Sequence, residues 1–185
     1  MILDNLLTFT GTSNGATGGI TSGAQTDAPT TGTQVASNII DLGVTSGVPS
    51  SANGGGARDI GIGDDPAMKL LVQVTTAFAS GTSLAVNIQG APDNGSGAPG
   101  TYTVMATGPV VAEAALIVGA RLLDIDMPRP APAQALPRFL QLGYVTVGTH
   151  TAGALKGFLV LDRHDLPEQS NAVLGGYPPG ITIAN

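Results

Sequence analysis

The chain has 185 residues, with 7 basic and 13 acidic side chains for a formal net charge of -6, a size that suits one domain with its own core. It holds no cysteine, which excludes disulfide bonds, thiolate metal sites and cysteine nucleophiles. Only 11% of the residues are charged and 4% are aromatic, so much of the surface must be neutral, as at the centre of a protein interface, which is a first indication of an assembly component.

The N-terminal residues predict no export signal. Asp4 stands where a secretory signal would carry a basic residue, and the apolar run around it is short. Residues 70–92 contain no charge, but they alternate polar and apolar positions and therefore predict no membrane-spanning helix. We expect an intracellular product without a membrane partner.

Alternation of polar and apolar residues is the clearest pattern along the chain. Residues 68–78 place apolar side chains at every second position, and residues 84–89 repeat the pattern after a short turn, so the two predict a β-hairpin. The expected strands, in chain order, cover residues 2–9, 37–42, 68–78, 84–89, 101–107, 116–127, 138–147 and 156–162.

Turn-forming residues separate the expected strands. Residues 90–100 are rich in glycine and proline and predict an exposed loop tip with a turn at Asn94 and Gly95, while prolines interrupt residues 128–137. Residues 110–118 are the only helix-like candidate, but they lack a capping residue and a polar face. Short strands and many turns favour an all-β sandwich of roughly eight strands, with the jelly roll as the commonest closed form.

We expect one jelly-roll domain over residues 1–162, with long loop insertions at about residues 10–36 and 46–57. Residues 163–185 contain Pro167, Pro178 and Pro179 and predict an extended C-terminal arm that contributes no core element. Arms of this kind often reach another subunit.

Basic residues are concentrated in one stretch. Residues 127–161 carry Arg129, Arg138 and Lys156 and no acidic residue. Three charges over this length fall far short of a nucleic-acid-binding patch, whose affinity scales with the number of phosphates neutralised. A solvated face is the simpler interpretation, and docking onto an acidic protein is the alternative.

Two patterns point to catalysis only weakly. Residues 11–15 match the Gly-x-Ser-x-Gly pattern of a hydrolase nucleophile elbow, with Ser13 as the nucleophile, but the glycines and threonines that follow cannot form the required helix. Asp124 and Asp126 share a face of an expected strand and could act as paired carboxylates. We favour the interpretation that Asp124 and Asp126 mark the end of a strand that emerges into solvent.

The candidate metal ligands are equally isolated. Asp64 and Asp65 precede a proline and indicate a turn, because the other oxygen ligands of a calcium loop are missing. His164 lies among carboxylates and His150 lies in a separate Thr/Gly turn, so we expect surface histidines. We therefore expect no enzyme, no metal site and no cofactor.

Several segments carry a family resemblance through their order and spacing. They are residues 1–4 with Leu6, Leu7 and Phe9, residues 58–61 leading into residues 71–78, and residues 84–89, 137–144, 151–153 and 159–162. Together they resemble the capsid cement, or decoration, proteins of short-tailed bacteriophages, typified by the cement protein of a Bordetella podophage. The insertion after Thr10 and the tail after Asp162 are longer than in the short members of that family.

The resemblance implies a jelly-roll protein that dimerises and clamps neighbouring major capsid subunits from the outside of the head. The implied partners are the major capsid protein and a second copy of the chain, and the implied location is the outer surface of the virion after synthesis in the host bacterial cytoplasm. Candidate interface residues are Arg129, Arg138, Leu174, Tyr177 and Ile181. We expect the two arginines to matter more for capsid attachment than Asp93 does.

The alternative is a β-sandwich module that binds carbohydrate or attaches the particle to its host. Such a module needs exposed aromatic side chains on which sugars stack, and Tyr102 and Tyr144 are the candidates. The chain has no tryptophan, 3 tyrosines and 4 phenylalanines, which counts against this alternative.

Overall fold

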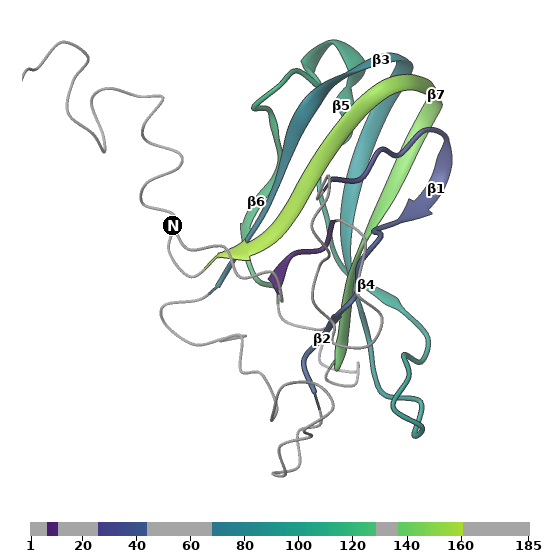
Figure 1. Cartoon of the computed structure of the whole chain (residues 1–185), viewed down its shortest axis with the longest axis vertical. Helices are drawn as coiled ribbons and strands as arrows, with labels where there is room; N and C mark the ends of the chain where they lie inside the picture. Colours follow the sequence, from purple (N-terminus) through teal and green to yellow (C-terminus); the bar gives the residue numbers. More distant parts are fainter. Residues whose placement is uncertain (1–6, 11–25, 44–67, 129–136, 161–185) are drawn as a thin grey trace, which may run out of the picture.

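A computed structural model describes residues 7–10, 26–43, 68–128 and 137–160 (Figure 1). These residues form one antiparallel sheet of seven strands, in which β1, β7, β3 and β4 are successive neighbours, β2 pairs with β7, and β5 and β6 pair with β3. The strands are β1 (Gly32–Val35), β2 (Ile40–Asp41), β3 (Lys69–Ala91), β4 (Thr103–Thr107), β5 (Val111–Ala112), β6 (Arg121–Asp126) and β7 (Phe139–Val160).

The described residues contain no α-helix, and a three-residue 3-10 turn, η3 (Glu113–Ala115), follows β5. Within these ranges no helix is long and apolar enough to cross a membrane.

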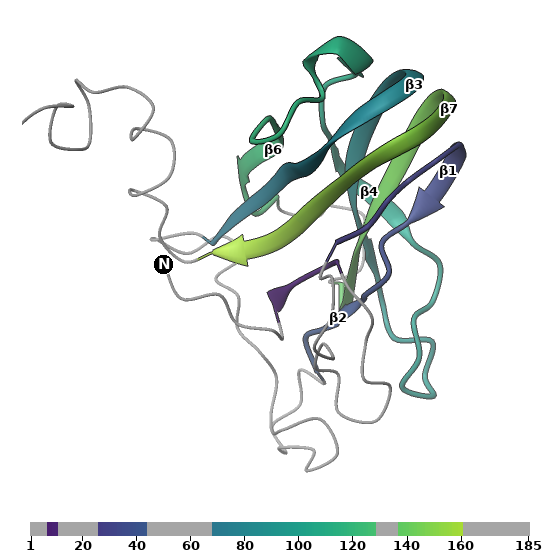
Figure 2. The ribbon, with the colours of Figure 1, turned by 45° about the horizontal axis from the view of Figure 1, so that its top comes forward.

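The two longest strands, β3 with 23 residues and β7 with 22, organise the sheet. They pair from Lys69 opposite Val160 to Ala91 opposite Phe139, with register shifts between Val74 and Ser83. Both strands bend together in this region, as Figures 1 and 2 show. The bend divides the sheet into a β6 side, with residues 69–78 and 154–160, and a β1 side, with residues 83–91 and 139–147 and strands β1, β2, β4 and β5.

The core lies between the inner faces of these two sides. One cluster of buried apolar residues includes Leu70 and Val72 from the β6 side and Val86 and Ile88 from the β1 side. A Cβ atom at Gly157 would lie 2.5 Å from Cδ1 of Leu142, so the two inner faces are in direct contact. Burying one such aliphatic side chain stabilises the folded state by about 1.5–3 kcal/mol. The alternating apolar side chains seen in the sequence therefore hold these strands against the core.

The predicted hairpin between residues 68–78 and 84–89 is wrong. Both segments belong to the continuous strand β3, and each pairs with β7 rather than with the other. Ser80 adopts a φ of 68° within the bend, and β7 bends beside it at Gly148 and Gly153, which have φ values of 78° and 132°. Because the two strands bend together, their hydrogen bonds continue on both sides.

The same bend joins two expected strands, 138–147 and 156–162, into β7. Strand β4 confirms the expected strand at 101–107, whereas β6 is shorter than the expected strand at 116–127 because a turn at Gly119 (φ 89°) precedes it. The helix-like residues 110–118 form β5 and η3 instead of an α-helix.

The N-terminal region differs most from expectation. Strand β1 lies inside the expected loop at 10–36, since its Gly-Thr-Gln-Val sequence shows no alternation, and the expected strand at 37–42 shortens to β2. Of the expected strand at 2–9, Thr8 forms an isolated bridge with Phe158. The expectation of a mostly β fold is confirmed, whereas hydrogen bonds define a single sheet and show no jelly-roll sandwich. The expected arm at 163–185 and the insertion at 46–57 lie outside the described residues.

Candidate functional site

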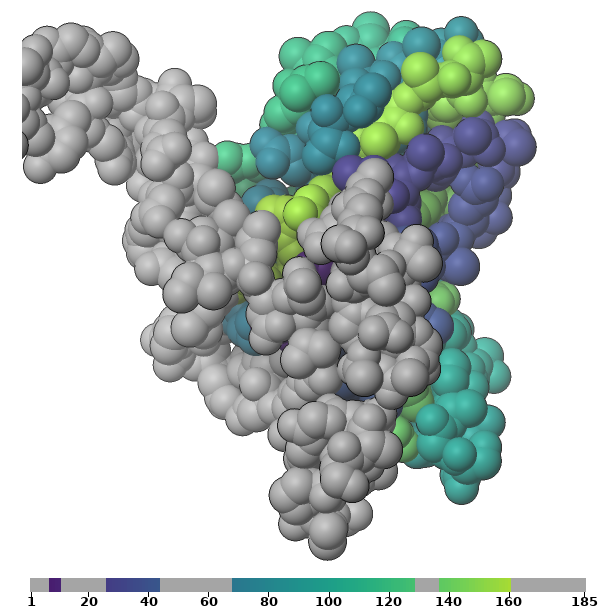
Figure 3. Space-filling model, in the orientation of Figure 1, coloured from purple at the N-terminus to yellow at the C-terminus, as the bar shows by residue number. Residues whose placement is uncertain are grey.

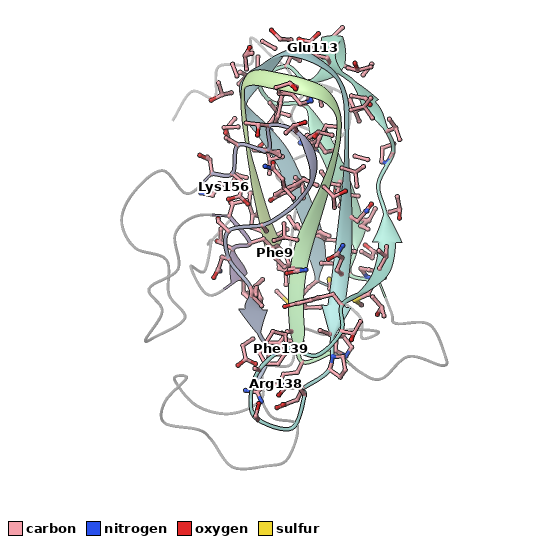
Figure 4. All side chains as sticks on the ribbon, turned by 90° about the vertical axis from the view of Figure 1, so that its right-hand side faces the viewer. Phe9, Glu113, Arg138, Phe139 and Lys156 are labelled. Carbon is pink, nitrogen blue, oxygen red and sulfur yellow. The ribbon has the colours of Figure 1, made fainter. Side chains whose placement is uncertain are left out.

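Arg138 joins three segments of chain at the end of the sheet opposite η3, as Figure 4 shows by the positions of Arg138 and Glu113. Its Nε donates to Asp41 Oδ1 at 2.9 Å and its Nη2 donates to Asp41 Oδ2 at 3.0 Å, a bidentate pair with β2. Its Nη1 donates to Asp93 in the loop between β3 and β4. The side chain is only 13% exposed, and hydrogen bonding to Asp41 raises the pKa of Arg138.

Asp93 in turn orders the loop at residues 92–100. Its Oδ1 accepts hydrogen bonds from the backbone N–H of Gly95 at 2.7 Å and of Gly97 at 3.0 Å. These two backbone donors, followed by Arg138, lower the pKa of Asp93 below its ordinary value. The predicted turn at Asn94 and Gly95 is confirmed, with Gly95 at a φ of 92° and Asn94 exposed. The loop projects beyond β4 (Figure 1), and Arg138 fixes its base to the sheet.

We expect Arg138→Gln to lower the thermal midpoint of unfolding by about 3–6 °C at pH 7. The substitution leaves the two carboxylates without their shared cation, in a site more enclosed than an ordinary surface pair. The folded-state pKa of Asp93 is depressed, so its contribution is present above the unfolded pKa of about 3.9 and is lost as the pH falls through the folded value. Melting curves at pH 7 and at about pH 3 should therefore show a smaller difference between the variant and the wild type at the acidic pH.

Arg121→Gln is the control for this change, because Arg121 pairs with Asp124 three residues away at 3.2 Å on the β6 side and has a more exposed side chain. A midpoint as low for Arg121→Gln as for Arg138→Gln would contradict the bracing role of Arg138.

A second polar cluster centres on Asp27, which is 8% exposed. Its Oδ2 accepts hydrogen bonds from the Tyr144 hydroxyl at 2.7 Å and from the Ser37 backbone N–H at 3.1 Å, and its Oδ1 accepts from the Ser37 hydroxyl. The Asp27 backbone also exchanges two hydrogen bonds with Leu155, each 2.9 Å long. Since Tyr144 lies on the β1 side and Leu155 on the β6 side, Asp27 ties the two sides together.

An open pocket of about 200 Å³ lies beside this cluster, lined by Asp27, Ala28, Pro29, Gln34, Val35, Ser37 and Tyr144. Burial, and then the neighbouring Asp27, raise the pKa of Tyr144 well above its ordinary value. The hydroxyl therefore stays protonated and donates to the carboxylate. This arrangement serves structure, because each polar group that the cluster buries has a partner within the chain.

The expected glycan platform at Tyr144 is wrong, since Tyr144 is 1% exposed and hydrogen-bonded to Asp27. Tyr102 is half-buried, and burial followed by the charge of Asp41 raises its pKa to about 12. The hydroxyl of Tyr102 is itself buried. Tyr144 offers no open ring face on which a sugar could stack, and the Tyr102 ring is only partly exposed.

The candidate catalytic residues are held in structural contacts. Asp124 pairs with Arg121, and Asp126 pairs with Lys69, so each carboxylate has its own cation. His150 is not the surface residue expected, because it is 2% exposed and its ring packs edge-on against Phe78 with centroids 5.1 Å apart.

No group of three histidine, aspartate or glutamate side chains that could hold a metal ion occurs in the described ranges. Ser13, Asp64, Asp65 and His164 lie outside the described residues.

Of the predicted interface residues, Arg138 forms its ion pairs within the chain. One of the partners of Arg138 is Asp93, the residue expected to matter less for capsid attachment. Arg129, Leu174, Tyr177 and Ile181 lie outside the described residues. The exposed large apolar residues, which the sequence reading did not single out, are Val35, Ile39, Val104, Val110, Ile117, Val118, Val145 and Val147. One signal could have found some of them: residues 144–147 are apolar or β-branched at both odd and even positions, more than one buried face requires.

The long paired strands, the two internal polar clusters and the exposed valines define a β-rich structural domain. The family model of Bbp16 matches residues 16–159, which is most of the chain. The chain belongs to the Bbp16 family, the Bordetella phage cement protein family. It is accordingly a non-enzymatic cement protein that binds the capsid lattice and lies on the surface of the virion. No curated protein matches the sequence.

Proposed function

We propose that the protein binds the outside of the expanded phage head as a homodimer and clamps neighbouring major capsid subunits. The pairing of β3 with β7 supports this function most directly. The two strands pair from Lys69 to Ala91 through their common bend, and Asp27 ties the two sides of the sheet together. A clamp must transmit force between its contacts, and a body braced in this way resists the deformation that would otherwise absorb the force.

Binding that is selective for the expanded lattice makes such a clamp favour the expanded state of the head over the unexpanded one. A protein that binds only the expanded lattice stabilises that lattice by RT ln(1 + [L]/Kd), which is about 2.7 kcal/mol per site at a concentration of one hundred times Kd. The same term acts at every occupied site of the shell. The head then resists the internal pressure of packaged DNA through many modest contributions.

We also propose the finer organisation that the sequence indicates. Residues 1–162 form a jelly-roll sandwich, for which the core shared by the β1 side and the β6 side is support, and residues 163–185 extend as an arm. The contact residues in this proposal are Arg129, Leu174, Tyr177 and Ile181. Arg138 acts on the contact indirectly, by fixing the loop at 92–100.

The function is tested on heads assembled with and without this protein. Heads that carry it should release DNA at a higher temperature, and adding the purified protein to bare expanded heads should restore the difference. Light scattering of the free protein should give the mass of two chains. Equal release temperatures, or cryo-EM density confined to the tail, would contradict the clamp, and a mass of one chain would contradict the dimer.

A further inference from the structure

One outer face of the sheet carries no ionisable side chain. It lies on the β1 side and consists of the outward positions of residues 83–89 of β3 and 141–147 of β7, with their partners on β1, β4 and β5, and we call it the neutral face. Val35, Val145 and Val147 lie on it with exposed fractions of 56%, 37% and 53%. Figure 3 shows β1 and the bend of β3 and β7 at the surface of the molecule.

The outward positions on the β6 side differ sharply in composition. They include Lys69 and Asp126, which pair with each other, and Asp124, which pairs with Arg121. An antiparallel sheet with one solvated face ordinarily alternates apolar inward and polar outward residues, and charges on that face discourage association. The outward positions of the β6 side carry these charges around a small buried apolar cluster of Leu71, Phe158 and Val160, whereas the neutral face carries no charge. Exposed valines without any charge are the composition found at the centre of protein interfaces.

The neutral face is also held in a fixed shape. Gln141 Nε2 donates to Gln89 Oε1 at 2.8 Å, which links β7 to β3 across the face. The Gln89 amide lies over Gly143, because a Cβ there would be 2.7 Å from Gln89 Nε2. Side chains that are already ordered lose little further entropy when a partner covers them.

The size of the face indicates its partner. Four strands about 4.8 Å apart and seven residues of about 3.4 Å each span about 450 Å². Two copies placed face to face would bury about 900 Å² in total, below the 1,200–2,000 Å² or so of stable isolated complexes. A capsid lattice repeats its binding sites and engages a cement protein through several contacts at once, so a small contact there adds to others.

We propose that the neutral face docks on an uncharged surface of a major capsid subunit. The proposal rests on the clamp function above and names the surface that performs it. The acidic excess of the chain, a formal net charge of -6, is then kept out of the contact. A contact without charge pairs depends little on ionic strength, unlike one made by complementary charges.

The test measures binding of full-length variants to expanded heads of the same phage that lack this protein. Val147→Glu and Val35→Glu each place a charge in the contact and should reduce occupancy about tenfold at the concentration that half-saturates with wild type. Val118→Glu is the matched control, because Val118 is 65% exposed in the turn before β6, away from the neutral face. Wild-type occupancy should change little between about 0.05 M and about 0.5 M salt.

Thermal unfolding of each free variant verifies its fold, and the edge position of Val35 provides a second variant if Val147→Glu unfolds. Wild-type occupancy for both glutamate variants would overturn the proposal, as would an equal loss for Val118→Glu. Normal capsid binding with a change in the mass of the free protein would assign the face to a second copy and overturn it too. Failure of the wild-type protein to bind or stabilise heads would instead contradict the clamp function itself.

Discussion

Gly81→Val is expected to destabilise the protein by about 3 kcal/mol, measured by chemical unfolding followed by circular dichroism. A Cβ atom at Gly81 would overlap the ring of His150, which is 2% exposed. The ring cannot move aside easily, because Phe78 packs against it and its Nε2 lies 3.4 Å from the Ser83 carbonyl oxygen. The His150 ring therefore packs directly against Gly81 in the bend of β3 and β7, where a larger residue has no room.

The neighbouring Thr82 provides the control, since it is exposed in the same bend and Thr82→Val should change stability by less than about 0.5 kcal/mol. The His150 ring is tested separately by combining Gly81→Ala with His150→Ala. In the His150→Ala background, Gly81→Ala should cost at least about 1 kcal/mol less than it does alone. An unchanged cost would show that the backbone at Gly81, rather than the His150 ring, requires the glycine.

The sequence predicts the inner face of the sheet well and its bend poorly. Alternation identified the inward side of Leu70 and Val72 as well as of Val86 and Ile88, because burial imposes a period of two on any such strand. The segment around Ser80 is equally suited to a hairpin turn and to a bend. The choice is made by β7, which bends alongside and keeps its hydrogen bonds to both halves of β3. Residues 79–82 carry no local signal that identifies β7 as the pairing partner.

The docking surface was predictable only in part. The low charge of the chain indicated an interface, but it did not say which face would lack charges, since that depends on the register that sets Val145 beside Ala85 and Thr33. The position of Arg138 shows the opposite error. A basic residue in an acid-free stretch looked available for docking, yet Asp41 and Asp93, 97 and 45 residues away, neutralise it within the chain.

Asp27→Ala is expected to cost about 2–4 kcal/mol, because it removes the acceptor of three hydrogen bonds in a buried cluster. The Tyr144 hydroxyl, on a side chain that is 1% exposed, would be left without its partner. Asp126→Ala is the control among acidic residues, since Asp126 is 65% exposed and pairs with Lys69 at the surface. An exposed pair of this kind contributes at most about 1 kcal/mol.

A double substitution separates the lost hydrogen bond from the loss of the carboxylate. Tyr144→Phe alone should cost about 1 kcal/mol, and it should cost almost nothing in the Asp27→Ala background, where the hydroxyl has already lost its acceptor. Additive costs would mean that Asp27 and Tyr144 stabilise the fold independently. Coupled costs would mean that one hydrogen bond joins the N-terminal segment to the β1 side, while the backbone of Asp27 holds the β6 side through Leu155. The bent sheet would then owe its rigidity to a carboxylate outside its strands as well as to its core.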